Sequence, residues 1–374
     1  HTLPDDFYSS EYFIDKAIEF IDSNENSQQP FFAYIPFQAV HTPVQAPKEY
    51  SDRYAGVYDE GWSVMREKRR QAAIATGVIP ADSQVKVTPG TPNWTESTDE
   101  QKRYDARRME VYAGMVDAMD THIGRLMSHL KSIGEYENTI FIFTSDNGAA
   151  SGGLNGLDGN APLNKWLERV GYSTDYETLG EKGSWLASGK GNASISNSPL
   201  IHYKFHTNEG GLRVPLVMSG PGISQQGELT DEFTFVTDLA PTILSLVGLN
   251  DHEGNFNGEK VEPIVGSNFA NYLSGTTQQI HSPSEPIGYE LGGSSALFKG
   301  DYKIVINRNE RNETEWHLFN IKADPGEVSD LKDEQPQLLE EMLADYEVWE
   351  RTNDVLPMPE NYNRGRTIFK GGFN

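Results

Sequence analysis

A regular helical repeat that runs directly into a short apolar strand sets the strongest limit on how this chain can fold. Apolar side chains recur every three or four positions over residues 109–130, which predicts a long helix with one buried face. Residues 139–144 follow after a polar turn and read Thr-Ile-Phe-Ile-Phe-Thr, which is typical of a buried strand. A helix that leads into a buried strand is the pattern of α/β folds. The sequence therefore predicts an α/β fold.

Other segments extend this pattern in both directions. Residues 37–108, which are rich in proline, and residues 148–200, which are rich in glycine and serine, are predicted to be long loops that line a site. Further helices are expected at 11–21 and 239–247, and further buried strands at 31–35 and 214–218.

The pattern changes after a polar, turn-rich stretch over residues 250–285. A hairpin is predicted at 297–306, followed by a strand at 316–320 and a helix at 336–350. Strands followed by a single helix favour a small antiparallel α+β subdomain. We therefore expect one domain over 1–284 and a C-terminal subdomain over 285–374.

The composition excludes several classes of partner and site. The net charge is −24, and so acidic a surface repels nucleic-acid phosphates, so we expect no nucleic-acid partner. The chain has no cysteine, which excludes disulfides and thiolate metal sites. No apolar run approaches the length of a membrane span. An anion-binding site in this chain must create a local positive potential against the overall charge.

Asp146 and Asn147 come directly after the predicted strand 139–144. Ligands of open α/β sheets bind beyond the carboxyl ends of the strands, and two oxygen side chains there suit a hard cation such as calcium or magnesium. Asp-Asn-Gly is also a common turn sequence, and two ligands are too few for a cation that takes about six to eight oxygens. These residues alone leave both interpretations open.

Two basic side chains are candidates for an anion site. His41 follows the predicted strand 31–35 in a proline-flanked loop, where an imidazole can bind an anion or protonate a leaving group. Lys204 can place its charge on a sulfate or phosphate oxygen. The alternatives are a solvated histidine and a solvated lysine. His202 and His206 have the spacing of a metal-binding pair on a helix, but no third ligand with suitable spacing accompanies them.

The stretches around these residues follow one another in a recognisable order. They are Phe31–Pro47 with His41, Ser145–Gly148, Lys204 with Glu209–Pro215, Thr237–Leu244, Leu297–Lys303 and Asp324–Glu327. In this order they resemble the sulfatase family, in its bacterial arylsulfatase branch, within the alkaline phosphatase superfamily. The resemblance runs over nearly the whole chain.

The resemblance implies an alkaline-phosphatase-like mixed sheet flanked by helices and the hydrolysis of a sulfuric ester, an aryl or other small-molecule sulfate. It implies that Asp146 and Asn147 are two ligands of a calcium ion and that Asp146 helps to deprotonate the nucleophile. His41 and Lys204 are implied to contact the sulfate and the bridging oxygen, and either can assist protonation of the leaving group. The family's nucleophile is a formylglycine made from Cys or Ser. A periplasmic or secreted location is implied as well.

The chain departs from the family's pattern in three motifs. The nucleophile motif, Cys or Ser followed by x-Pro-x-Arg, is absent, and so are the acidic pair after the first strand and the Gly-Lys-x-His segment. We therefore expect a truncated or cleaved sulfatase that is inactive alone and whose partner is its own N-terminal segment. Calcium binding is expected to be weak or absent, because part of the ligand shell is missing. Missing strands also predict exposed sheet edges and exposed apolar surface.

Two alternatives stay open at this point. A phosphonate monoester hydrolase or phosphodiesterase of the same superfamily would share Asp146, Asn147 and the metal, and rates on matched esters would distinguish it. A non-catalytic fragment would explain the missing nucleophile, and it is excluded if an added upstream segment restores turnover.

Overall fold

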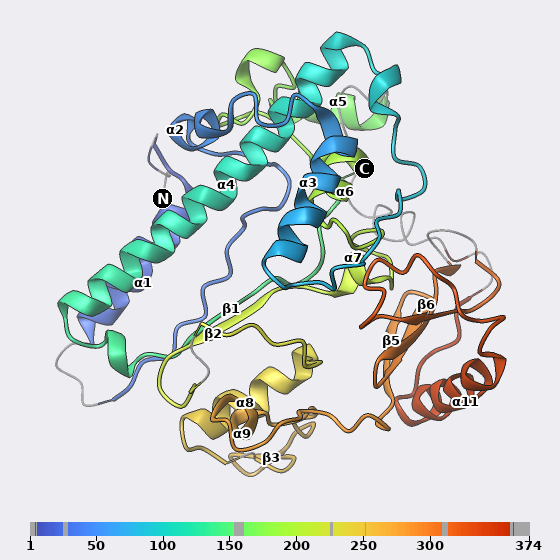
Figure 1. Cartoon of the computed structure of the whole chain (residues 1–374). Helices are drawn as coiled ribbons and strands as arrows, with labels where there is room; N and C mark the ends of the chain where they lie inside the picture. Colours follow the sequence, from blue (N-terminus) through green and yellow to red (C-terminus); the bar gives the residue numbers. More distant parts are fainter. Residues whose placement is uncertain are drawn as a thin grey trace.

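The computed structural model describes residues 4, 6–24, 29–152, 161–224, 227–250, 252–308, 313–359 and 362, with side chains at all of these except 161–164. A layer of helices lies above a central two-stranded ribbon, and a four-stranded sheet lies beyond the right-hand end of the ribbon (Figure 1). A smaller helical segment lies below the ribbon in the same view.

The predicted helix at 109–130 is confirmed as part of a longer helix, α4 (Asp99–Ser132). A capping box closes its first turn, because the Thr98 hydroxyl accepts from the Gln101 N–H while the Gln101 side chain accepts from the Thr98 N–H. The prediction started the helix too late because the residues before 109 are mostly charged.

The predicted helix at 11–21 is confirmed as α1 (Ser9–Ser23), which lies beside α4 (Figure 1). The contact buries one stripe of each helix. Its fully or nearly fully buried members are Ile14, Ile21, Leu126 and Leu130. Hydrophobic burial between these stripes fixes the layer on this side of the molecule.

The prediction of a long loop over 37–108 was wrong. The helices α2 (Lys48–Ser51) and α3 (Gly61–Ala75) lie within this stretch, and the prolines fall before and after them. The residues of α3 are polar on average, so this helix is stabilised by tertiary packing. Its buried face belongs to a cluster with the residues before it, with α4 and with α6: Tyr58, Trp62, Met65, Ala106, Met109 and Ile195.

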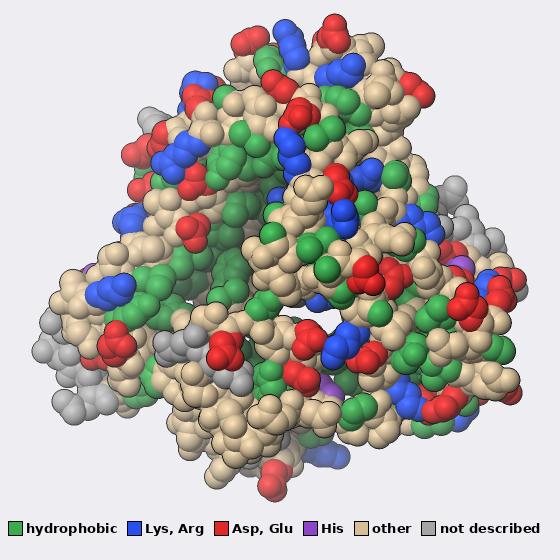
Figure 2. Space-filling model, in the orientation of Figure 1, with side chains coloured by type: hydrophobic (Ala, Val, Ile, Leu, Met, Phe, Trp, Pro, Cys, Tyr) green, Lys and Arg blue, Asp and Glu red, His purple; other side chains and the backbone are tan. Residues whose placement is uncertain are grey.

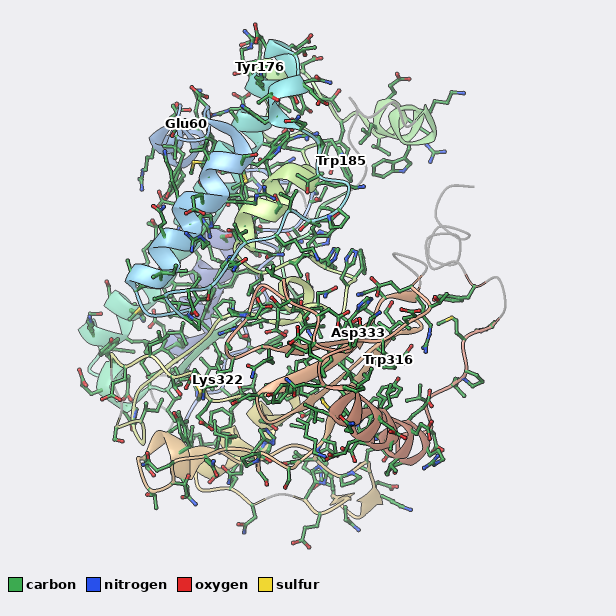
Figure 3. The ribbon with its side chains drawn as sticks, turned by 45° about the vertical axis from the view of Figure 1, so that its right-hand side comes forward. Glu60, Tyr176, Trp185, Trp316, Lys322 and Asp333 are labelled. Carbon is green, nitrogen blue, oxygen red and sulfur yellow. The ribbon has the colours of Figure 1, made fainter. Side chains whose placement is uncertain are left out.

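The predicted loop over 148–200 was also wrong in part, since it contains α5 (Ala161–Val170) and α6 (Gly189–Ser196). Its residues 153–160 lie outside the described part of the chain. The large aromatic side chains of this stretch are half-buried against one another, with ring centroids 5.4, 5.5 and 6.2 Å apart: Trp166, Tyr172 and Trp185 (Trp185 is labelled in Figure 3).

The central ribbon consists of β1 (Phe141–Thr144) and β2 (Leu216–Ser219), paired antiparallel with Phe141 opposite Ser219. Both strands were predicted within a few residues, but the prediction that they are buried was wrong, because no residue of either strand is buried. The buried strand predicted at 31–35 is wrong, because this segment is not a strand and its Phe32 and Tyr34 are 79% and 80% exposed. The reason is that a strand needs a partner's backbone, and no described segment pairs with this one.

The predicted helix at 239–247 is confirmed as α8 (Leu239–Leu246), which packs with the short helix α9 (Ala270–Leu273). The buried Asp238 carboxylate precedes α8. It accepts from the backbone N–H of Phe235 at 2.7 Å and of Ser267 at 2.7 Å, and it lies 2.8 Å from the His281 ring. This one side chain therefore ties three separate segments together.

The C-terminal sheet has the order β5-β6-β7-β8, with every neighbouring pair antiparallel. Its strands are β5 (Ile287–Leu291), β6 (Ser294–Lys299), β7 (Tyr302–Ile306) and β8 (His317–Asn320). The predicted hairpin is the β6–β7 pair, and the boundary at 284/285 stays a prediction.

Helix α11 (Pro336–Thr352) covers one face of this sheet (Figure 1). Leu297 and Ile304 from the sheet and Met342 from the helix are completely buried between them. Trp316, labelled in Figure 3, lies near Tyr346 of the helix, with ring centroids 5.0 Å apart and planes tilted by 59°. The sheet and the helix thus bury apolar surface against each other.

The remaining elements are short: η1 (Asp52–Tyr54), η2 (Trp94–Glu96), η3 (Tyr136–Asn138), η5 (Tyr176–Thr178), α7 (Glu209–Leu212), η6 (Val236–Asp238), β3 (Asn255–Phe256) and β4 (Glu259–Lys260). None of the described helices combines the length and the apolar character that a bilayer span requires.

Candidate active site

Asp146 and Asn147 lie just beyond the carboxyl end of β1, as predicted from the strand pattern. Asp146 is exposed and Asn147 is half-buried. The Ser145 hydroxyl donates to the backbone oxygen of Asn147 at 2.9 Å, which closes a turn. Gly148 then approaches the backbone of Gly210 so closely that a Cβ would lie 1.9 Å from the Gly210 oxygen. The segment after Asp146 therefore packs closely against a second loop, which contains Gly210.

That second loop carries Lys204. Its backbone N–H donates to the oxygen of Ala149 at 2.9 Å, so the two predicted motifs meet directly. His202 and Phe205, on either side of Lys204, have the left-handed φ values 63° and 82°, which are unusual for these residue types. The Lys204 side chain is half-buried, and its Nζ lies 5.5 Å from the centroid of the Phe205 ring.

Asn197 joins the two segments, and sequence reasoning missed it. Its Oδ1 accepts from the Ala149 N–H at 3.0 Å, while its Nδ2 donates to the backbone oxygens of His202 at 2.9 Å and Gly210 at 2.7 Å. One amide therefore holds the chain on both sides of Lys204. No sequence signal marks it, because an asparagine before Ser-Pro is ordinary turn chemistry.

The loop that carries His41 meets the same segment at Gly152. Thr42, the neighbour of His41, has its Oγ1 3.5 Å from the position that a Cβ on Gly152 would take. The His41 ring is exposed, and its Nδ1 lies 2.9 Å from the Thr42 backbone oxygen. A carbonyl oxygen can only accept, so Nδ1 carries the hydrogen and Nε2 is the acceptor of the neutral ring.

The structure therefore brings the loops of His41 and Lys204 to one segment, which the Lys204 backbone meets at Ala149 and Thr42 meets at Gly152. Within the described residues, no hydrogen bond joins the side chains of His41, Asp146, Asn147 and Lys204 to one another. The chemistry available is a set of separate charged and polar groups around one stretch of backbone. Such a set suits an anion held by several contacts.

The metal site implied by the resemblance does not fit the described residues as a complete site. Asp146 and Asn147 offer two oxygen side chains, whereas calcium takes about six to eight oxygens. The described part of the chain holds no group of three or more His, Asp or Glu side chains placed to bind a metal.

The alternative metal pair His202 and His206 does not lie on a helix. The two buried imidazoles stack, with centroids 4.5 Å apart and planes 9° apart, and the His206 Nδ1 lies 3.1 Å from the Tyr203 oxygen. Stacked rings with these contacts form part of the packing beneath Lys204.

Comparison with known proteins places these features in context. The family model described as sulfatase matches residues 2–249, and the model described as N-sulphoglucosamine sulphohydrolase, C-terminal, matches residues 201–347. The chain is 36% identical over 367 residues to an uncharacterized sulfatase of Schizosaccharomyces pombe, with 97% of this chain and 65% of that protein covered. It is 34% identical over 266 residues to an arylsulfatase of Klebsiella aerogenes, with 71% of this chain and 56% of that protein covered.

Solved structures agree on the fold. Ps i-CgsB, solved in complex with k-i-k-neocarrahexaose, superposes with a TM-score of 0.56 at 22% identity, covering 96% of this chain and 58% of that one. A protein solved with its substrate D-glucosamine-2-N,6-O-disulfate gives a TM-score of 0.53 at 18% identity, covering 95% of this chain and 72% of that one. These likenesses confirm the α/β fold class. The chain spans 65% and 56% of the two relatives named above.

Proposed function

This chain belongs to the sulfatase family, and we propose that the protein hydrolyses a sulfate ester. The observation that carries the proposal is the bond from the Lys204 N–H to the Ala149 oxygen at 2.9 Å. It sets the backbone of Lys204, a half-buried residue, beside the segment that follows the carboxyl end of β1, where ligands of α/β sheets bind. The sequence similarity to an arylsulfatase supports an aryl or other small-molecule sulfate as the substrate.

Lys204 and His41 are the proposed contacts of the sulfate group. The ammonium of Lys204 offsets negative charge on the sulfate oxygens, and its partial burial strengthens that interaction relative to bulk water. The His41 Nδ1 hydrogen is directed at Thr42, so Nε2 can donate to a sulfate or bridging oxygen only when both ring nitrogens are protonated. A doubly protonated His41 can then hand its Nε2 proton to the departing alcohol.

Asp146 is the proposed base for the nucleophile. Its exposed carboxylate is able to take a proton from a hydroxyl at the end of β1. A formylglycine hydrate would supply that hydroxyl and carry the sulfate as a covalent ester. The printed sequence has no Cys or Ser followed by x-Pro-x-Arg, so we propose that these 374 residues do not turn over a sulfate ester alone.

Three finer assignments complete the proposal. Asp146 and Asn147 are proposed as two ligands of a calcium ion that requires further oxygen ligands. A segment that carries the nucleophile is the proposed partner of this chain. A periplasmic or secreted location is proposed on the family resemblance alone.

Replacement of Lys204 tests the function. In the catalytically active form of the protein, we expect Lys204→Ala to lower kcat/KM for an aryl sulfate by about 100-fold to 1000-fold, the size of losing one donor to a developing anion. Lys260→Ala removes an exposed lysine on β4 and serves as the control, with no expected change. The measurement is steady-state hydrolysis of matched aryl sulfate and aryl phosphate esters.

The same assay decides between the alternatives. A faster rate on the phosphate or phosphonate ester than on the sulfate would replace the proposal by a phosphonate or phosphodiester hydrolase. Equal kcat/KM values for Lys204→Ala and the unmodified protein would show that Lys204 does not contact the sulfate group. That result would not contradict the proposed reaction itself.

A further inference from the structure

We propose that Lys303, on strand β7 of the C-terminal sheet, is a positioning residue for Lys204. It acts through a buried cluster with Glu209 and Glu327 that holds the loop carrying Lys204. The inference rests on the proposed function, in which Lys204 contacts the sulfate group.

The cluster joins two parts of the molecule that are far apart in sequence. Lys303 and Glu327 are completely buried, and the Glu209 side chain is 5% exposed. The Lys303 Nζ lies 2.9 Å from the Glu209 Oε1 and 3.1 Å from the Glu327 Oε1. The Glu327 Oε2 also accepts from the Glu209 backbone N–H at 2.8 Å. Glu209, the first residue of α7, is therefore held through both its side chain and its backbone.

Burial and charge act against each other in this cluster, since burial raises the pKa of the Glu327 carboxyl and the Lys303 ammonium opposes that rise. Burial by itself lowers the pKa of the Lys303 ammonium, but the carboxylates of Glu209 and Glu327 outweigh it and raise that pKa above its ordinary value. The partly exposed Arg213 adds a second cation, 4.0 Å from the Glu209 Oε2. A buried ion cluster is weak evidence for stability, because apolar side chains of similar volume often stabilise a core as well. The contribution of these ion pairs is to fix the positions of Lys303, Glu209 and Glu327 relative to one another.

A second contact from the end of β7 holds the same loop. Asn307 is buried, and its Oδ1 accepts from the Thr207 N–H at 2.8 Å while its Nδ2 donates to the Asn208 Oδ1 at 2.9 Å. Asn307 and Lys303 together contact three consecutive residues of the loop, Thr207 to Glu209. The C-terminal sheet thus reaches to within three residues of Lys204.

Lys204 is consequently held from two sides. On one side its backbone bonds to Ala149, and Asn197 bonds to both neighbouring segments. On the other side, β7 fixes the residues that follow it. Gly210 and Gly211 pack so tightly on this loop that a Cβ would lie 2.3 Å from the His202 oxygen and 2.1 Å from the His206 oxygen. A shift of α7 therefore moves Lys204 relative to Asp146.

The first test uses the 374-residue chain itself. Lys303→Met removes the buried ammonium, and Lys299→Met is the matched control, because Lys299 also lies in this sheet between two carboxylates but faces α11. We expect amide hydrogen exchange at residues 202–212 to become about tenfold faster or more in Lys303→Met and to stay unchanged in Lys299→Met. Equal exchange in the two variants would overturn the proposal.

The second test is a double-mutant cycle in the catalytically active form. We expect Lys303→Met to lower kcat/KM on a sulfate ester by about 100-fold, the cost of misplacing a positioned group, with Lys299→Met close to the unmodified protein. In a Lys204→Ala background the loss caused by Lys303→Met should largely disappear. A loss of equal size in both backgrounds would show that Lys303 has only a structural role.

A second variant and a second readout allow the positioning role of Lys303 to be tested separately from the proposed function. If Lys303→Met does not fold, Glu327→Gln removes one of the two carboxylates that contact the Lys303 ammonium and enters the same exchange measurement and cycle. If no sulfate ester is hydrolysed by any form of the protein, the proposed function fails. The exchange comparison then still decides whether β7 positions the Lys204 loop.

Discussion

The C-terminal sheet and the β1–β2 ribbon are built from the same kinds of residue but differ in burial. In β7, Ile304 is 0% and Val305 1% exposed. In the ribbon no residue of either strand is buried, and Val217 is 59% and Phe143 38% exposed. β-branched and aromatic side chains therefore form a core in one place and a surface in the other.

The difference lies in what covers each sheet. Helix α11 packs on one face of the C-terminal sheet, and its inner strands each have two neighbours. The ribbon has two strands among the described residues, and two strands alone are marginal in water. Figure 2 shows a hollow beside the α1–α4 pair in which hydrophobic side chains gather. Stabilisation by apolar residues thus depends on a second layer that removes them from water.

The same substitution in the two regions gives the largest expected contrast. Val305→Ala should lower the free energy of unfolding by about 2–3 kcal/mol, because that side chain is 1% exposed, on the sheet face opposite Ile304 and α11. Val217→Ala should change it by less than about 0.5 kcal/mol, because that side chain is already exposed. Urea unfolding followed by tryptophan fluorescence measures both. Equal losses would mean that the ribbon is covered in solution.

The hydrogen-bonded pair of Asp238 and His281 allows a second test of the comparison, because this pair connects the C-terminal sheet to the rest of the chain. It links the segment before α8 to the segment that leads into β5. The hydrogen bond to Asp238 raises the pKa of His281 above its ordinary value. A raised folded pKa means that the stabilisation is complete below pH about 6.5 and is lost as pH rises through the folded pKa.

We therefore expect His281→Gln to cost more stability at pH about 5.5 than at pH about 9. The measurement is the free energy of unfolding of both proteins at each pH, with His252→Gln as the control for a histidine elsewhere. A cost that does not vary with pH would show that the pair contributes no charge-dependent stability.

A third prediction concerns the uncovered surface itself. Phe32→Ser should leave the free energy of unfolding within about 0.5 kcal/mol of its original value while it reduces binding of a hydrophobic dye. Leu356→Ser changes a comparably exposed apolar side chain in the C-terminal tail and is the control, with a smaller loss of dye binding expected. A large loss of stability in Phe32→Ser would show that residues 31–35 are buried in solution.

The smallest effect is expected for calcium. Asp146 and Asn147 lie at the end of the uncovered ribbon, and the described residues do not complete a calcium site. We expect titration calorimetry of the 374-residue chain with calcium to give weak or no heat. Tight stoichiometric binding would show that further ligands assemble around Asp146.

Much of the local structure followed from the sequence. The helices around residues 109–130 and 336–350 and the hairpin at 297–306 were predicted because each has a clear apolar period and acceptable turn residues. The strand at 31–35 was predicted by the same rule and is wrong, because an apolar run can specify a strand only if a neighbouring strand pairs with it.

The candidate site divides in the same way. His41, Asp146, Asn147 and Lys204 were identified from their sequence contexts, and their roles stay predictions. Asn197 and the Lys303 cluster were not identified, because nothing near them in sequence marks them. They become meaningful only through contacts such as the 2.9 Å from Lys303 Nζ to Glu209 Oε1.

By itself, the sequence determined the class of fold, the positions of most helices and strands, the family resemblance and the residues expected to carry chemistry. These depend on side-chain period, turn chemistry and short motifs, which are local properties. Tertiary structure alone decided which apolar strands are buried, that the loops of His41 and Lys204 meet one segment, and that Lys303 on β7 contacts the loop that carries Lys204. Burial and hydrogen-bond partners depend on residues far away in the chain, and no local pattern records them.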